Sequence, residues 1–159
     1  CQKAARKIIN DEPCENFVFT GDVGRGKTHL SLAVANEVFD HGKKVIYKRT
    51  NDLLEEIRTA KYENHEENAL EKFIACDLLV IDDFGADTAS DFAKSQLRIL
   101  LEERNLNHKA WIISTNLSLN MIEDIYSPRI ADRLLENARI FSFESPRSIR
   151  EILRAERLG

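Results

Sequence analysis

The chain has 159 residues and a mass of 18.3 kDa, a length that suits one domain and is short for two. Hydrophobic residues make up 43% and charged residues 31%, a balance that excludes a disordered chain and a membrane-embedded one. The 23 basic and 27 acidic side chains give a formal net charge of −4, so we do not expect the chain to coat duplex DNA by charge alone.

Cysteine usage and the chain start bear on compartment. Cys1, Cys14 and Cys76 are widely spaced and form no CxxC pair, which argues against a disulfide framework and a cysteine zinc site. We therefore expect a reducing, cytoplasmic compartment. No apolar run reaches the roughly 18 residues of a membrane span, and the charged amphipathic start does not resemble a signal peptide. Since residue 1 is not Met, we expect a fragment of a longer protein whose N-terminal, partner-binding segment is missing.

Short apolar runs alternate with longer amphipathic runs along the chain. The apolar runs predict strands at 16–20, 44–47, 77–81, 110–114 and 139–143. The 3.6-residue periodicity and the Ser-Pro start signals predict helices at 27–39, 52–61 (capped by Thr50 or Asn51), 69–75, 90–105, 128–135 and 146–158. A polar stretch, 62–68, is expected to be a loop.

This alternation predicts an α/β fold in which helices cover both faces of a parallel sheet, because parallel crossovers are right-handed. The run 77–81 (DLLVI) is apolar at nearly every position, as expected for a central strand buried on both faces. In such sheets ligands bind at the carboxyl ends of the strands. The residues that follow each strand are therefore the candidates for function.

A glycine-rich turn follows the first predicted strand. Residues 21–28 are GDVGRGKT, which matches the phosphate-binding pattern G-x-x-x-x-G-K-[ST] between a strand and a helix. Glycines let backbone N–H groups point inward, and the next helix adds its positive dipole end. We expect Lys27 to reach the β- and γ-phosphates and the Thr28 hydroxyl to hold Mg²⁺. The predicted nucleotide-binding residues are Gly21, Asp22, Val23, Gly24, Arg25, Gly26, Lys27, Thr28 and His29, the last expected on a helix face rather than as a catalyst.

Polar residues also end the third and fourth predicted strands. We expect Asp82 to bind the water shell of Mg²⁺ and Asp83 to orient or deprotonate the attacking water. The alternative is a solvated acidic loop, but the position downstream of a phosphate turn favours the metal role. Asp83 is one methylene shorter than the Glu usual here in many such ATPases, which predicts slow turnover. Asn116 is expected beside the γ-phosphate, or else it starts the next turn.

Two pairs of arginines lie near the end of the chain. Arg129 and Arg133 share one face of the helix at 128–135, so one of them could reach a neighbouring subunit's γ-phosphate. The alternative is a surface salt bridge, for example with Asp132 or Glu136. Arg147 and Arg150 open the last predicted helix and could contact nucleotide within the same subunit or face solvent.

Five segments together resemble the ATPase domain of the DnaC/DnaI-like replicative helicase loaders, with the insertion-sequence helper ATPase IstB as a close relative of the pattern. They are GDVGRGKTHL, DLLVIDDFGAD, IISTN, SPRIADRLLE and FESPRS. The resemblance covers about residues 5–150. The phosphate turn and acid pair are generic to the AAA+ superfamily. The GKTHL continuation, the FGAD and the R-x-x-x-R-L segment followed by S-x-R-S are more specific.

The resemblance implies a three-layer P-loop NTPase fold of the AAA+ type over residues 1–159. Its five-stranded parallel sheet would have the order 5-1-4-3-2, with a minimal or absent helical lid. It implies ATP or ADP and Mg²⁺ as cofactors. The implied catalytic residues are Asp83, Asn116 as sensor one, Arg133 as arginine finger and Arg147 as sensor two, with Arg150 as its alternative; the implied metal residues are Thr28 and Asp82.

The same resemblance implies a function in DNA replication. A loader would bind ATP, self-associate in a nucleotide-dependent oligomer and help place a DnaB-like ring helicase on single-stranded DNA. The element at 52–75 faces DNA in such proteins, but here its acids outnumber its bases. Lys48 and Arg49 are the better candidates for DNA contact. The alternatives are an IstB-like transposition helper and a nucleotide-switched adaptor with little hydrolysis; no membrane partner is expected.

Overall fold

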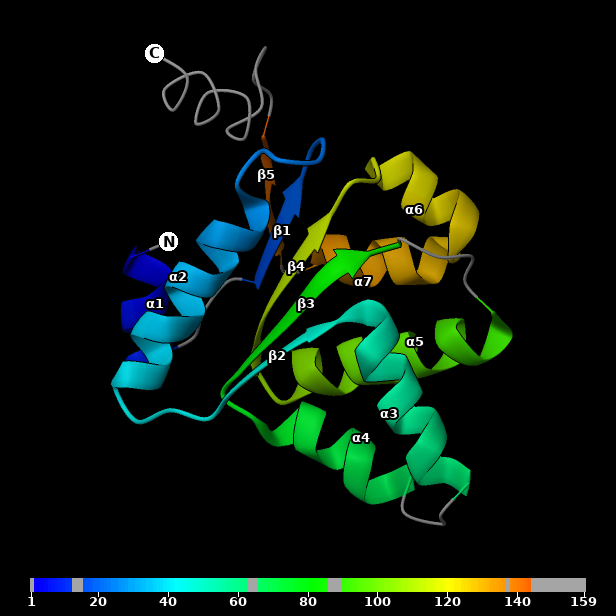
Figure 1. The fold of residues 1–159 in the computed structure, drawn as a ribbon, viewed down its shortest axis with the longest axis horizontal. Coiled ribbons are helices and arrows are strands. Elements are labelled where there is room, and N and C mark those ends of the chain that lie inside the picture. Colours follow the sequence, from blue (N-terminus) through cyan, green and yellow to red (C-terminus); the bar gives the residue numbers. More distant parts are fainter. Residues whose placement is uncertain (1, 13–15, 63–65, 86–89, 137, 144–159) are drawn as a thin grey trace, which may run out of the picture.

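A computed structural model describes residues 2–12, 16–62, 66–85, 90–136 and 138–143 (Figure 1). It contains a five-stranded parallel sheet in the order β2-β3-β4-β1-β5. The predicted order 5-1-4-3-2 is the same order counted from the other edge, so this prediction is confirmed. The strands are β1 (Asn16–Thr20), β2 (Val45–Arg49), β3 (Leu78–Phe84), β4 (Ala110–Thr115) and β5 (Ala138–Ser142).

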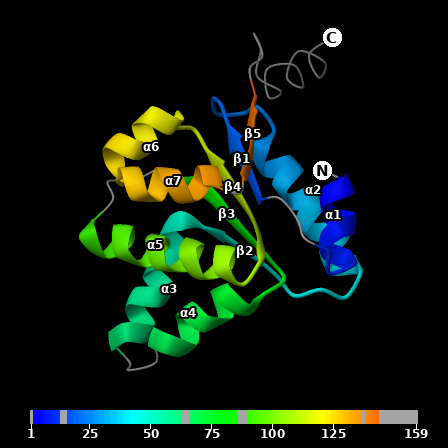
Figure 2. The ribbon, with the colours of Figure 1, turned by 180° about the vertical axis from the view of Figure 1, so that it is seen from behind.

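Helices cover both faces of this sheet. They are α1 (Gln2–Ile9), α2 (Lys27–Asp40), α3 (Thr50–Tyr62), α4 (Glu66–Ala75), α5 (Asp91–Leu106), α6 (Leu119–Ile125) and α7 (Pro128–Glu136). Figures 1 and 2 show α1 and α2 on one face and α3 to α7 on the other. Among the helices that the structure describes, none combines the length and apolar character that crossing a membrane requires.

Alternation along β3 explains how one strand serves two cores. Leu79 and Ile81 pack with the helices α3 to α7, while Leu78 and Val80 pack beneath α1 and α2. Successive side chains of a strand point to opposite faces, so a strand covered on both sides is apolar throughout. Asp82 continues the row of Leu78 and Val80 and thus lies on the face that α2 covers.

Several elements differ from the predictions. The stretch 62–68 was expected to be a loop, but α3 includes Tyr62 and α4 begins at Glu66. Residues 62 and 66–68 are polar and yet helical, so polarity alone does not indicate a loop. Helix α3 begins at Thr50, whose hydroxyl donates to the backbone oxygen of Asp82 at 3.2 Å. Short α6 was not predicted, although Ser118 caps it by accepting from the Met121 amide. The expected helix at 146–158 lies outside the described residues.

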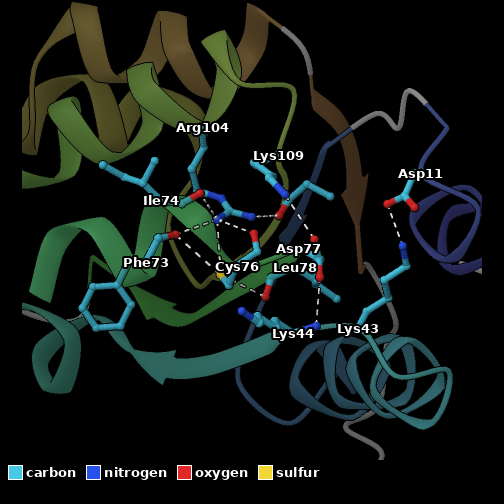
Figure 3. A network of polar contacts seen from close by, with 11 residues as sticks. Asp11, Lys43, Lys44, Phe73, Ile74, Cys76, Asp77, Leu78, Arg104 and Lys109 are labelled. Atoms are coloured by element: carbon cyan, nitrogen blue, oxygen red, sulfur yellow. Dashed lines mark hydrogen bonds and ion pairs between the residues drawn. The ribbon is translucent and has the colours of Figure 1, made fainter. Parts of the chain in front are cut away.

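Arg104 connects several elements at the amino end of the sheet by hydrogen bonds (Figure 3). Its side chain is 0% exposed and donates to the carbonyls of Phe73 at 2.6 Å, of Ile74 and Cys76 at 3.0 Å, and also to that of Ala110. These bonds join α5 to the end of α4 and to the start of β4. Burial lowers the pKa of Arg104, and the four acceptors satisfy a charge that would otherwise be costly to bury.

Candidate functional site

The turn between β1 and α2 depends on glycine at two positions. Gly26, the residue before α2, has φ of 91°, a conformation that glycine adopts without strain. A Cβ on Gly21 would lie 2.7 Å from the backbone oxygen of Phe143. No side chain caps α2, so the first amides of this 14-residue helix face the turn unblocked. Such a helix start favours an anion.

Lys27 fills the centre of this turn. Its ammonium group donates to the carbonyl oxygens of Gly21 at 2.5 Å and Asp22 at 2.8 Å, and to Oδ1 of Asn116 at 2.8 Å. The side chain is 7% exposed, and this burial lowers the pKa of Lys27 although Asp82 and Asp83 act to raise it. The predicted phosphate lysine and the predicted sensor asparagine are thus in direct contact, across the neighbouring strands β1 and β4.

Asp82 is buried at the carboxyl end of β3, with 4% of its surface exposed. Thr28, in the first turn of α2, donates to its two carboxylate oxygens at 3.2 and 3.0 Å. Ser114 donates to Oδ1 and Tyr47 donates to Oδ2. Because β3 lies between β2 and β4, the flanking strands supply Tyr47 and Ser114, and α2 supplies Thr28 from above.

Asp83 has a different environment from its neighbour. The β3 ladder shifts register between Ile81 and Phe84, and Asp83 has φ of 54°. This left-handed conformation costs about 1 kcal/mol or more in a residue other than glycine, and such residues cluster at functional sites. The irregularity leaves the Asp83 side chain exposed while Asp82 stays buried. Its amide still donates to Ser114 Oγ at 3.4 Å.

These groups line one cavity of about 420 Å³ at the carboxyl edge of the sheet. Its walls include the predicted residues Val23, Gly24, Arg25, Gly26, Lys27, Thr28, His29, Asp82, Asp83 and Asn116, together with Leu32. The remaining two predicted residues, Gly21 and Asp22, meet Lys27 through their carbonyls. The twelve residues predicted for this site from three separate segments therefore lie together.

The oxygen donors at this site suit magnesium. Thr28 and Asp82 offer a hydroxyl and a carboxylate beside the phosphate turn, and oxygen ligands are what Mg²⁺ prefers. Within the described ranges, no three His, Cys, Asp or Glu side chains gather into a metal cage. Magnesium in phosphate sites is typically held by one or two protein groups together with substrate phosphates, so this sparse donor set fits it.

The two predicted arginines that the structure describes, Arg129 and Arg133, are not among the residues that line the cavity. Arg133 on α7 forms an ion pair with Glu102 of α5, with Nε 3.5 Å from Oε1, and its side chain is 35% exposed. This is a salt bridge, as in the expected alternative, and here an acid of α5 takes part in it, because α7 packs against α5. Arg129 is exposed. Arg147 and Arg150 lie outside the described residues.

A ring contact links the acid pair to the end of α6. Phe84 follows Asp83 directly, and its ring stacks on Tyr126 with centroids 4.7 Å apart. Tyr126 follows the last residue of α6, just before α7 begins. The segment that carries the acids thus packs against the junction between α6 and α7.

Three residues that contact Asp82 were not predicted as site residues from the sequence: Tyr47, Ser114 and Thr50. Tyr47 and Ser114 look like ordinary strand residues along the chain. The signal that could have found them is the alternation of side chains along a strand. With β3 between β2 and β4, this alternation places Tyr47 and Ser114 on the same face of the sheet as Asp82. That signal needs the strand register, which one sequence alone does not give.

This strand order, with a phosphate-type turn after β1, acids after β3 and an asparagine after β4, defines a P-loop NTPase domain of the AAA+ type. The comparisons agree with this class. The chain belongs to the family of IstB-like ATP-binding proteins, whose family model matches residues 5–151. The resemblance predicted from the motifs is confirmed.

The chain is similar to proteins of DNA replication. It is 30% identical over 152 residues to the replicative helicase loader DnaC of Escherichia coli strain K12, covering 91% of this chain and 62% of DnaC. A crystal structure of the DnaC helicase loader superposes with a TM-score of 0.78 at 22% identity, covering 88% of this chain and 86% of that one. AMPPCP-bound DnaA from Aquifex aeolicus gives 0.82 at 21% identity, covering 98% and 49%. The chain spans about 60% of the length of the helicase loaders it matches.

Proposed function

We propose that this chain is the ATP-binding and ATP-hydrolysing AAA+ domain of a cytoplasmic loader for a replicative helicase. One observation carries the proposal: in a single cavity at the strand ends, Lys27 contacts Asn116 and Thr28 contacts Asp82. The DnaC relatives and the DnaA structure with a bound ATP analogue support ATP as the ligand and replication as the setting.

In this proposal Lys27 exchanges its carbonyl partners for phosphate oxygens, and the first amides of α2 bind the β-phosphate side of the nucleotide. Thr28 and Asp82 hold Mg²⁺, which neutralises charge on the phosphates when bound. Exposed Asp83 accepts a proton from the attacking water, and Asn116 orients the γ-phosphate or that water. The short reach of Asp83 predicts slow hydrolysis by the chain alone.

Assembly and partners extend the proposal. To serve as an arginine finger, Arg133 would leave its ion pair with Glu102 and reach the γ-phosphate of a neighbouring subunit. Such a contact makes assembly depend on nucleotide. The partners we propose are a DnaB-like ring helicase and single-stranded DNA; a DnaA neighbour was solved with single-stranded DNA.

Cations proposed for DNA contact are already paired in the structure. Lys48 forms an ion pair with Glu56 at 3.0 Å, and Arg49 with Asp52 at 3.0 Å. These acids compete with phosphate groups for the cations. We therefore expect single-strand binding to be weak at physiological salt and to fall further as salt rises.

A transposition helper is the second candidate, because the matching family model is named for IstB-like proteins. Both candidates share the same nucleotide chemistry and differ in the partner. Pull-down of the protein with a purified ring helicase and, separately, with a transposase distinguishes them. Capture of the transposase alone would favour the helper.

Calorimetry with ATP, ADP and Mg²⁺ tests the shared nucleotide chemistry. We expect wild type to bind both nucleotides and to release phosphate slowly, and Lys27→Ala to lose both properties. Lys109→Ala, at the opposite end of the sheet, is the matched control and should behave as wild type. If wild type takes up no nucleotide, the proposed function is wrong; if it binds but releases no more phosphate than Lys27→Ala even with partner and DNA, the protein is a switched adaptor and not an ATPase.

A further inference from the structure

Tyr47 is a polar residue in the middle of β2 for which the nucleotide motifs have no role. In the parallel pairing of β2 with β3, Tyr47 lies opposite Val80 and Arg49 lies opposite Asp82. Alternation therefore puts Tyr47 and Asp82 on the same face of the sheet, two residues apart along the strand direction. That offset is roughly 6.6 Å, which the length of a tyrosine side chain can bridge.

The two ends of the Tyr47 side chain have different surroundings. Its ring packs against the apolar residues under α1 and α2, and its hydroxyl donates to Oδ2 of Asp82. A phenol has an ordinary pKa of about 10, so it is protonated at neutral pH and can donate to the carboxylate of Asp82.

Side chains from both neighbouring strands donate hydrogen bonds to the carboxylate of Asp82. Tyr47 of β2 takes one carboxylate oxygen and Ser114 of β4 takes the other. With the two oxygens held from opposite sides, the carboxylate plane cannot turn freely, and Thr28 meets it in one orientation. Groups that orient a metal-binding carboxylate by hydrogen bonding commonly change metal affinity 10- to 100-fold when removed.

We propose that Tyr47 is a positioning residue that holds Asp82 in the orientation needed for magnesium beside the phosphate turn. The inference rests on the proposed nucleotide site and goes beyond it, because it assigns a role to a β2 residue outside the motifs. A purely structural Tyr47 would need only its ring, which phenylalanine also supplies. The hydroxyl is thus the group to remove.

The test compares Tyr47→Phe with wild type for affinity toward a fluorescent ATP analogue, once with excess Mg²⁺ and once with excess EDTA. The ratio of the two affinities is the metal-dependent gain. We expect Tyr47→Phe to bind the analogue in EDTA as tightly as wild type does, and its metal-dependent gain to be roughly tenfold smaller. Tyr126→Phe, which removes a hydroxyl on the other face of the sheet, should match wild type. Tyr47→Leu provides a second hydroxyl-free variant, with thermal unfolding measured for each protein.

The Asp82→Asn background completes the design. If Tyr47 acts through Asp82, Tyr47→Phe adds no further loss of the metal-dependent gain in that background. An unchanged gain in Tyr47→Phe, an equal loss with and without metal, or a full additional loss on Asp82→Asn overturns the inference. Any of these results with normal wild-type binding leaves the proposed function intact, whereas wild type that binds no nucleotide removes both.

Discussion

Arg104→Met is the substitution with the largest predicted effect on stability. It removes the buried donor that Phe73, Ile74, Cys76 and Ala110 share, and it keeps an unbranched side chain of similar length. Each buried carbonyl left without a partner costs about 1 to 3 kcal/mol. A plain sum overestimates the loss, because the variant no longer buries a guanidinium and the carbonyls at the end of α4 can gain water.

We therefore expect Arg104→Met to lower the free energy of unfolding by about 3 to 5 kcal/mol. At roughly 2 to 4 °C per kcal/mol for a domain of this size, the unfolding temperature should fall by about 6 to 20 °C. Urea denaturation at 25 °C gives the free energy directly. Arg98→Met is the matched control on the same helix; it breaks only a partly exposed pair with Glu102 and should cost less than about 1 kcal/mol.

We call the buried hydrogen bonds of Arg104 to the four carbonyls the Arg104 clamp. A loss below about 1 kcal/mol in Arg104→Met would refute its role in stability, since it would mean that the carbonyls find other partners at no cost. Nucleotide affinity of the folded variant should match wild type. The clamp joins the amino ends of β3 and β4, and the nucleotide cavity lies at their carboxyl ends. Loss of affinity at a temperature where the variant is folded would contradict this separation.

Three further predictions concern the site, assembly and pH. Asp83→Asn should keep nucleotide affinity within about threefold and reduce phosphate release by roughly 10²- to 10⁴-fold, in a single-turnover assay; unchanged release would exclude Asp83 as the base. Arg133→Ala should bind nucleotide normally but lose any ATP-dependent shift in gel filtration that wild type shows, while Arg129→Ala keeps it; loss in both variants would point to α7 as a whole and not to one side chain. Burial alone would raise the pKa of Asp77, but the Lys44 amide and Lys109 lower it below its ordinary 3.8, so its contribution to stability is present above about pH 4 and is lost as pH falls through the lower folded-state pKa. Urea unfolding between pH 2 and 6 should show this loss in wild type and a smaller slope in Asp77→Asn; equal slopes would contradict it.

The strands and the phosphate turn could be predicted because their signals are local. The run at 16–20 has the observed bounds of β1, and the glycine pattern needs only its neighbouring strand and helix. For β3 the prediction ended too early, at 81, because charged residues usually end a buried strand. Here Asp82 stays inside the sheet, since hydroxyls from three other elements satisfy its carboxylate.

Other features could not be predicted, because they depend on pairing between distant segments. Tyr47 and Asp82 are 35 positions apart, and Arg133 and Glu102 are 31 apart. The role of Arg104 is likewise invisible in a helix that looks amphipathic and ordinary. Each of these contacts is specified by strand register or helix packing, and those are properties of the folded chain as a whole.

The Arg104 clamp and the reacting groups lie at opposite ends of the sheet. This separation means that a subunit can lose its chemistry without losing its fold. A copy that has lost Lys27 or Asp83 keeps the fastening around Arg104, so it should remain folded and long-lived. In the proposed nucleotide-dependent oligomer, such a copy would still occupy a subunit position, but it would not bind or hydrolyse ATP normally. When inactive and intact subunits mix in one oligomer, we expect the ATPase activity to fall by more than the fraction of inactive subunits.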